Sequence, residues 1–134
     1  MFTDPWSPGD FAECLAVGMS ILVAEQDAAL TGYIVGRSVL DEAEILNVGV
    51  APPARRHGVA RALVGALLAA FAGVGVRSVF LEVRESNFPA RVLYQSFDFH
   101  EVGRRLRYYR RPVEDAVILR AGIRQEHLLE GVGV

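Results

Sequence analysis

The chain has 134 residues, of which 51% are hydrophobic and 22% charged, and its formal net charge is −2. This composition predicts one globular domain with a sizeable core, because disordered chains are poorer in apolar residues. A slightly acidic chain offers no overall electrostatic attraction to nucleic acid. The single cysteine, Cys14, excludes an internal disulfide, and three scattered histidines add no metal-ligand spacing. The sequence lacks the pattern of a signal peptide and an apolar run of the roughly 18 residues that a membrane span needs, so we expect a cytoplasmic protein.

The first third of the chain combines a short helix with β-rich segments. Ser7-Pro8-Gly9-Asp10 has the form of a capping box and predicts a helix from Ser7 to about Val17. The apolar runs that follow are separated by short polar turns such as Asp27-Ala28-Ala29, a pattern typical of an antiparallel meander. The expected strands are Ile21–Ala24, Tyr33–Val35 with a continuation at Val39–Leu40, and Ile45–Val50.

The middle of the chain has a helix followed by a strand. Apolar residues recur with the spacing of one helix face at Ala60, Leu63, Val64, Leu67, Leu68 and Phe71. Gly73 and Gly75 end this helix. The nearly continuous apolar run Val79–Val83 predicts a central strand buried on both faces. Strand, helix and strand in this order predict a parallel pair joined by a right-handed crossover.

The last third predicts a second helix and a final pair of strands. The helix begins at Asn87-Phe88-Pro89 and continues through Phe97, with Asn87 as its cap. The strands are Phe99–Tyr109 and Ala116–Leu119, before a tail over about residues 121–134. The chain is therefore expected to form one α/β domain over residues 1–134. Its mixed sheet joins an antiparallel meander to a parallel central pair flanked by helices.

A basic loop links the run that ends at Val50 to the first apolar helix. It reads Arg55-Arg56-His57-Gly58-Val59-Ala60-Arg61. Glycine and a small residue leave the backbone N–H groups accessible, and the following helix adds the positive end of its dipole. The loop therefore predicts a phosphorylated ligand.

The spacing Arg-x-x-Gly-x-Ala in this loop resembles the pyrophosphate loop of the GNAT (GCN5-related N-acetyltransferase) family. Further segments in the same order resemble its ribosomal-protein-alanine N-acetyltransferases: Asp4-Pro5-Trp6-Ser7, Leu46–Val50, Leu81–Asn87, Leu93-Tyr94, Tyr108-Tyr109 and Glu114-Asp115-Ala116. The resemblance covers about residues 4 to 120. It implies that a free amine attacks acetyl-CoA, the co-substrate, directly, without a covalent enzyme intermediate and without a metal.

The resemblance also implies the acetyl-CoA contacts. The pyrophosphate would bind to Arg55, Arg56, His57, Gly58, Val59, Ala60 and Arg61, with Ala60 where glycine is commoner. Backbone groups of Val48, Gly49 and Val50 would bind the pantetheine arm and polarise the thioester carbonyl, and Asn87 would add a cofactor contact. Gly49 within a strand pattern independently indicates a bulge or a close backbone approach.

Glu82 and Tyr94 are the expected catalytic residues. An α-amine with a pKa of about 8 is mostly protonated at neutral pH, so a base has to remove a proton. On an apolar strand, desolvation would raise the pKa of Glu82 toward the working range, while the alternative is a carboxylate paired with Arg84 or another arginine. The family position of Tyr94 implies that it protonates the departing thiolate, whereas periodicity alone fits a core tyrosine beside Leu93 and Phe97.

The acceptor is expected to bind at Tyr108, Tyr109 and Trp6. The tyrosine pair resembles the one with which N-terminal acetyltransferases hold the backbone of a peptide, so the resemblance implies a peptide or protein α-amine with a small first residue, a ribosomal protein among the candidates. A small-molecule amine or lysine acetyltransferase of the same fold is an open alternative, as is a catalytically weak acyl-CoA-binding interaction module. The dense arginines between Arg104 and Arg111 fit a solvated strand better than a nucleic-acid surface.

The chain departs from the family at its N-terminus. Family members have a strand and a helix before the Pro-Trp-Ser segment, and only four residues lead into it here. Without that strand, Ile21–Ala24 would be an open sheet edge, which is a template for pairing with another chain. We therefore expect a homodimer or aggregation through this edge, unless upstream residues or the C-terminal tail cover it.

Overall fold

The computed structural model describes residues 19–52 and 58–123. The predicted helix from Ser7 to Val17, including Cys14, lies outside the described residues, and so do Trp6, the loop residues Arg55–His57, and the chain from residue 124 onward.

The described residues form a single mixed sheet with two helices. The elements are β1 (Ser20–Gln26), β2 (Ala29–Val39), β3 (Glu42–Val50), α2 (Val59–Gly73), β4 (Ser78–Arg84), α3 (Phe88–Gln95), β5 (His100–Arg110) and β6 (Val113–Gly122). The strand order is β1-β2-β3-β4-β6-β5, and β3 and β4 are parallel while the other neighbours are antiparallel. The predicted meander with a parallel central pair is confirmed. The insertion of β6 between β4 and β5 does not follow from the order of the strands along the chain.

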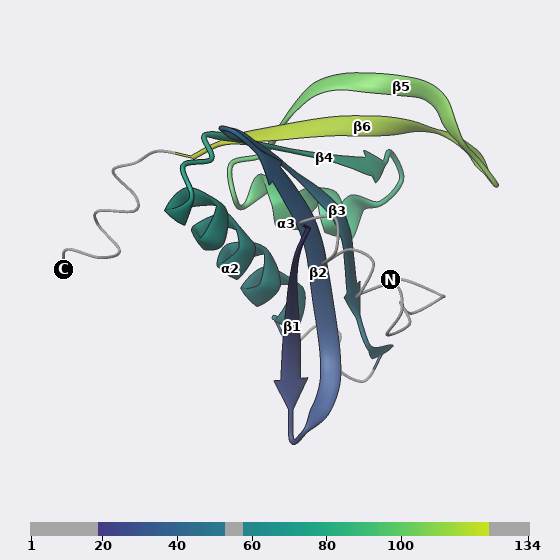
Figure 1. The fold of residues 1–134 in the computed structure, drawn as a ribbon. Helices are drawn as coiled ribbons and strands as arrows, with labels where there is room; N and C mark the ends of the chain where they lie inside the picture. Colours follow the sequence, from purple (N-terminus) through teal and green to yellow (C-terminus); the bar gives the residue numbers. More distant parts are fainter. Residues whose placement is uncertain (1–18, 53–57, 124–134) are drawn as a thin grey trace.

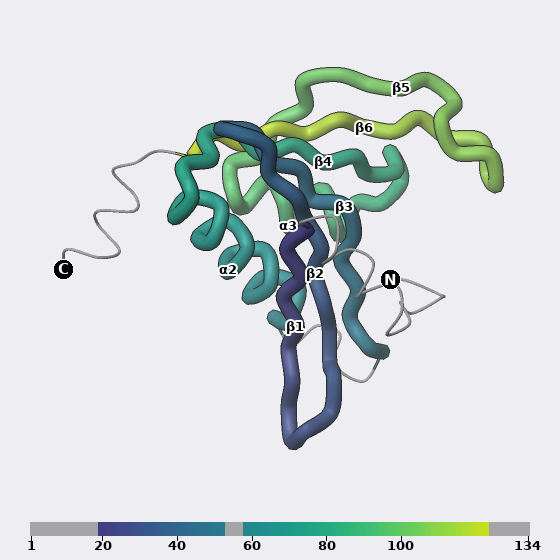
Figure 2. Tube along the Cα trace, viewed as in Figure 1, coloured from purple at the N-terminus to yellow at the C-terminus, as the bar shows by residue number. Residues whose placement is uncertain are grey.

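The strands separate into two groups that point in different directions. Figure 1 shows β1, β2 and β3 side by side in the lower part of the view, while β4, β5 and β6 extend to the right. The tube in Figure 2 shows the same divergence between β3 and β4. These two strands pair only from Glu42 with Ser78 to Glu44 with Phe80. Beyond that point the sheet opens, and this opening positions the candidate site.

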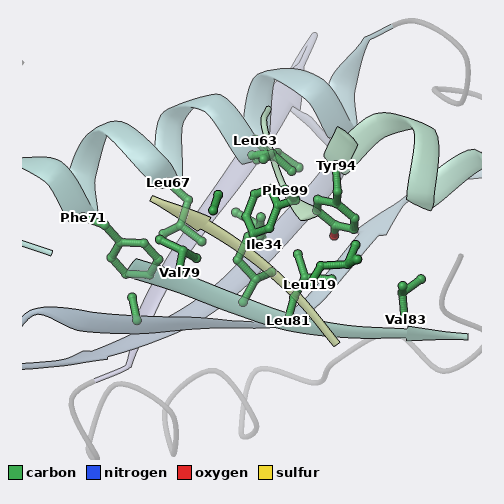
Figure 3. Close-up of a cluster of buried hydrophobic side chains, with 14 of the residues drawn as sticks. Ile34, Leu63, Leu67, Phe71, Val79, Leu81, Val83, Tyr94, Phe99 and Leu119 are labelled. Atoms are coloured by element: carbon green, nitrogen blue, oxygen red, sulfur yellow. The ribbon is translucent and has the colours of Figure 1, made fainter. Parts of the chain in front are cut away.

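The hydrophobic core lies between the two helices and one face of the sheet (Figure 3). On β4 the side chains of Val79, Leu81 and Val83 are buried in this core, whereas Phe80, Glu82 and Arg84 alternate with them and are only half-buried. The expectation that β4 is buried on both faces was wrong. Alternation along a strand sends every second side chain to the opposite face, here called the outer face. Of the four β4 residues on the outer face, Ser78, Phe80, Glu82 and Arg84, two are charged.

Local signals placed the two helices correctly. Gly58 precedes α2 in the left-handed region with φ of 77°, and Gly75 follows it with φ of 88°. Asn87 caps α3, since its Oδ1 accepts a hydrogen bond of 3.2 Å from the backbone N–H of Ala90. Helix α3 ends at Gln95, two residues before the predicted end at Phe97.

The bulge predicted at Gly49 lies elsewhere on β3. Val35 pairs with Asn47 and Gly36 with Ile45, so Leu46 is the extra residue, while Gly49 pairs regularly with Tyr33. The close approach that the structure shows here is at Gly32, the residue on β2 diagonally opposite Gly49. A Cβ on Gly32 would lie 2.9 Å from the Gly49 carbonyl oxygen, so Gly32 is the residue that has to lack a side chain.

Candidate active site

A cleft of about 700 Å³ lies where β3 and β4 diverge. Its walls come from β3, β4, the loop between β4 and α3, α3 itself, and β5. Val48, Glu82, Asn87, Tyr94 and Tyr109 all line it. Residues that the sequence singled out on separate segments therefore share one space in the structure.

One edge of β3 faces this cleft with its backbone. The N–H of Ala51 donates to the carbonyl of Thr31 on the β2 side, at 2.8 Å. Backbone groups alternate in direction along a strand, so Gly49 also faces β2, and Val48 and Val50 direct their N–H and C=O groups toward the cleft. Among the described strands, β4 no longer pairs with β3 at this level. Two of the three predicted backbone contacts are thus available to a ligand, and Gly49 is not.

The N-terminus of α2 is uncapped in the part of the chain that the structure describes. Among the described residues no side chain caps this end, and its first turn carries no acidic residue. No heavy atom of the described residues lies within 4 Å of the position where a side chain on Gly58 would begin. The guanidinium of Arg61 does not face this space, because its Nη1 donates to Ser96 Oγ at 2.9 Å and its Cζ lies 5.6 Å from the Phe97 ring centroid. In the described part of the loop, the backbone from Gly58 to Arg61 is what an anion can contact.

Tyr94 reaches the cleft from the helix face of the sheet. Its side chain extends from α3 toward the strands (Figure 3), is 4% exposed, and forms an edge-to-face pair with Phe99 at 5.5 Å. Burial raises the pKa of Tyr94 to about 12. The hydroxyl therefore keeps its proton throughout the physiological pH range.

Glu82 reaches the cleft from the outer face. Its side chain is 26% exposed, and its Oε1 lies 2.7 Å from Nε of Arg105 on β5. The apolar surroundings expected from the strand pattern are therefore wrong, because a guanidinium contacts the carboxylate. The arginine alternative is observed with Arg105, whereas Arg84 pairs with Glu114 at 3.2 Å. Glu82 and Tyr94 thus approach the cleft from opposite faces of the sheet.

The hairpin of β5 and β6 closes one side of the cleft through Tyr109. The rings of Tyr108 and Tyr109 are nearly perpendicular at 83°, with centroids 5.2 Å apart. Tyr108 is 51% exposed, whereas Tyr109 lines the cleft. Burial, followed by the negative charge of Glu82, raises the pKa of Tyr109. The Arg84 guanidinium lies 4.1 Å from the Tyr109 ring centroid, in the geometry of a cation–π contact.

Glu114 ties the hairpin to the end of β4. Its carboxylate accepts hydrogen bonds of 2.9 Å from both the backbone N–H and the Oγ of Ser86, and one of 3.2 Å from Arg84. The Ser86 hydrogen bonds, followed by Arg84, lower the pKa of Glu114. This carboxylate therefore remains charged at neutral pH and holds the loop after β4 against β6.

Two further residues at this site were missed from the sequence. Asn47 lines the cleft, and its side chain interacts with that of Tyr33. Its position beside the bulge depends on the register of β2 and β3, which the local pattern does not encode. Arg105 is one of five arginines in a short segment, and no local signal distinguishes it from the others.

The described residues contain no group of three or more histidine, cysteine or acidic side chains that could hold a metal ion. Within the same ranges, neither helix is long and apolar enough to cross a membrane.

Comparison with known proteins places this geometry in a family. Residues 1–99 match the model of the acetyltransferase (GNAT) family. The chain belongs to the GNAT family. This confirms the family predicted from the sequence. The protein is an acetyl-CoA-dependent N-acetyltransferase.

Named relatives of this GNAT enzyme cover most of its length. It is 35% identical over 119 residues to the [ribosomal protein bS18]-alanine N-acetyltransferase of Escherichia coli K12, spanning 86% of this chain and 79% of the relative. It is 40% identical over 122 residues to the N-alpha-acetyltransferase RimI of Mycobacterium tuberculosis, spanning 87% and 75%. The crystal structure of the ribosomal-protein-S18-alanine N-acetyltransferase from Escherichia coli superposes with a TM-score of 0.81 at 34% identity, over 90% of this chain and 79% of that one.

Proposed function

We propose that this GNAT enzyme acetylates the α-amine of a protein or peptide with a small first residue such as alanine, and that its natural acceptor is a ribosomal protein. The observation that carries the proposal is the single cleft that Glu82, Tyr94 and the β3 backbone share. The names of the relatives, which specify an alanine α-amine on a ribosomal protein, support the acceptor class.

Acetyl-CoA would lie along β3 with its pyrophosphate at the start of α2. The loop Arg55–Arg61 would supply backbone N–H groups and the positive end of the helix dipole. The N–H and C=O groups of Val48 and Val50, which no described strand pairs with, would then match the amides of the pantetheine arm. Asn87 uses its Oδ1 to cap α3, so its amide N–H groups are left for a contact with the cofactor.

The transfer reaction needs a base for the ammonium and a donor for the thiolate. Glu82 would take the proton from the acceptor ammonium, directly or through water, and the neutral amine would attack the thioester carbonyl carbon. A backbone N–H of β3 would stabilise the oxyanion. As the C–S bond breaks, Tyr94, kept protonated by its raised pKa, would donate to the sulfur and protonate the thiolate. Glu82 and Tyr94 reach the cleft from opposite faces of the sheet. This arrangement fits an amine that enters on the Glu82 side and a thiolate that leaves on the Tyr94 side.

The acceptor backbone would lie against the tyrosine pair. Tyr109 lines the cleft next to Glu82 and is held there by Arg84, and Tyr108 offers an exposed ring beside it. The Trp6 segment would complete this surface.

Mass spectrometry of three acceptors incubated with acetyl-CoA tests the proposal. The first is a peptide with a free N-terminal alanine and an internal lysine, the second is the same peptide with a blocked N-terminus, and the third is a polyamine. Acetylation confined to the α-amine of the first peptide is the expected result. Preference for the blocked peptide or the polyamine would indicate a lysine or small-molecule enzyme, and no product from any acceptor would indicate a weak acyl-CoA-binding module.

A further inference from the structure

Glu82 borders a second cavity in addition to the cleft. This outer cavity, of about 330 Å³, lies against the outer face of the sheet and shares Glu82 and Leu81 with the cleft. Its charged lining consists of Arg37, Glu42, Glu44, Glu82 and Arg105. A ligand in the outer cavity can therefore contact the same carboxylate that faces the acetyl-CoA side.

The two arginines of the outer cavity each contact one of its carboxylates. Arg37 pairs with Glu44 at 3.1 Å, and Arg105 pairs with Glu82 at 2.7 Å. The Arg105 side chain is 58% exposed. Exposed ion pairs between long side chains and carboxylates are weak, because water and salt screen them and the side chain loses rotamer freedom. The Arg105 guanidinium is therefore held loosely enough to be displaced by another cation.

The Arg105 guanidinium also lies beside an aromatic ring while it pairs with Glu82. It lies on β5, which ends the strand order, and its pairing with Ala116 is the last before the register with β6 breaks. Its Cζ lies 5.6 Å from the Tyr108 ring centroid, within the range of a cation–π contact. Because this contact coexists with the ion pair, the Tyr108 ring remains a partner for the guanidinium when the pair with Glu82 breaks.

An acceptor amine arrives at neutral pH mainly as an ammonium ion. It needs the carboxylate of Glu82 both as a counter-ion and as a proton acceptor, and Arg105 occupies one oxygen of that carboxylate. We propose that Arg105 competes with the acceptor for Glu82. In the free enzyme the Arg105 guanidinium occupies the position beside the Glu82 carboxylate, and the ammonium group of the acceptor displaces it when the acceptor binds. Arg105 is then a residue that sets acceptor affinity by acting through Glu82. This inference rests on the proposed function.

Kinetics of three variants test the exchange. Arg105→Gln removes the competing charge, Arg105→Lys keeps a cation there, and Arg110→Gln removes an exposed arginine of the same strand that lies outside the lining of the outer cavity. The KM of an alanine-initiated peptide should fall roughly two- to fivefold in Arg105→Gln, the range for the loss of one exposed ion pair. The KM of acetyl-CoA should not change. Arg105→Lys and Arg110→Gln should resemble the wild type.

Salt supplies a readout that a purely structural role would not change. At about 1 M salt, where charges are screened over roughly 3 Å, the difference in peptide KM between the wild type and Arg105→Gln should largely disappear. A peptide KM in Arg105→Gln that equals or exceeds the wild-type value at low salt would overturn the proposal.

A binding measurement separates this inference from the proposed function. Calorimetry with an alanine-initiated tripeptide amide, in the presence of CoA rather than acetyl-CoA, reports acceptor affinity without turnover. Binding roughly two- to fivefold tighter to Arg105→Gln than to the wild type supports the exchange, even if the wild type turns the peptide over poorly. Equal or weaker binding, or no binding to either protein, overturns it. Acetylation of the same peptide by the wild type tests the proposed function on its own.

Discussion

Tyr94→Phe separates the chemical role of the hydroxyl from its structural role. The substitution removes one oxygen from a ring that is 4% exposed and leaves the contact with Phe99 intact. If the hydroxyl protonates the thiolate, turnover of an alanine-initiated peptide should fall by roughly 10²–10⁴-fold. The dissociation constant for CoA, measured by calorimetry, should change much less. Turnover close to that of the wild type would refute the assigned role.

The same variant has a calculable effect on stability at high pH. Burial raises the pKa of Tyr94 from 10.0 to about 12, so in the unfolded chain this tyrosine ionises first. The stability that Tyr94 contributes is present below about pH 10 and is lost as the pH rises to about 12. Two pH units at about 1.4 kcal/mol each give about 3 kcal/mol.

Urea unfolding between pH 9 and pH 12 measures this loss. The wild type should lose about 2 kcal/mol more than Tyr94→Phe across that interval, because at pH 12 Tyr94 is only half ionised in the folded protein. Tyr33 and Tyr109, whose pKa values are also raised, are present in both proteins and cancel in the comparison. Equal losses in the two proteins would refute the desolvation of Tyr94.

Three further predictions concern the phosphate loop, the packing and the sheet edge. Gly58→Glu places a carboxylate where the loop backbone has to approach the pyrophosphate, so calorimetry should show CoA affinity at least roughly tenfold weaker; unchanged affinity would mean that the loop is wrongly assigned. Gly36→Ala should lower the free energy of unfolding by about 1–3 kcal/mol, because the new Cβ would lie 2.8 Å from Cζ of Phe71. Gly65→Ala lies within α2, and its new Cβ would have its nearest contact at 3.7 Å, so this variant should raise the free energy of unfolding by about 0.5–1 kcal/mol. Equal changes for Gly36→Ala and Gly65→Ala in urea unfolding would contradict the close packing at Gly36. Pairing through β1, which ends the strand order, should give a dimer or larger species in light scattering, and a clean monomer at high concentration would contradict it.

Features encoded by neighbouring residues could be predicted from the sequence. The apolar repeat of α2, the Asn87 cap of α3 and the parallel pair joined through α2 all follow from local spacing and chain order. The family motif assigns Glu82, Tyr94 and Asn87 to one site, and all three line the same cleft. Each of these depends on a periodicity, a turn residue or a short motif.

Features that depend on pairing between distant strands could not be predicted. The bulge at Leu46 and the Asn47 contact follow from the register of β2 against β3, and β6 lies beside β4 although β5 precedes it in the chain. The ion pair of Glu82 with Arg105 requires the order of three strands to be known. The prediction that β4 is buried on both faces was wrong for a related reason. Phe80 lies on the same face as Glu82 and Arg84, and this apolar residue makes the sequence of β4 resemble that of a strand buried on both faces.

The role of Glu82 as the base in this cleft is tested most directly by Glu82→Gln, which keeps the size of the side chain and removes its charge. The measurement is kcat for an alanine-initiated peptide at saturating acetyl-CoA, with CoA affinity determined in parallel. If Glu82 is the base, kcat should be lower by roughly 10²–10⁴-fold with CoA affinity nearly unchanged. A kcat near the wild-type value would contradict it.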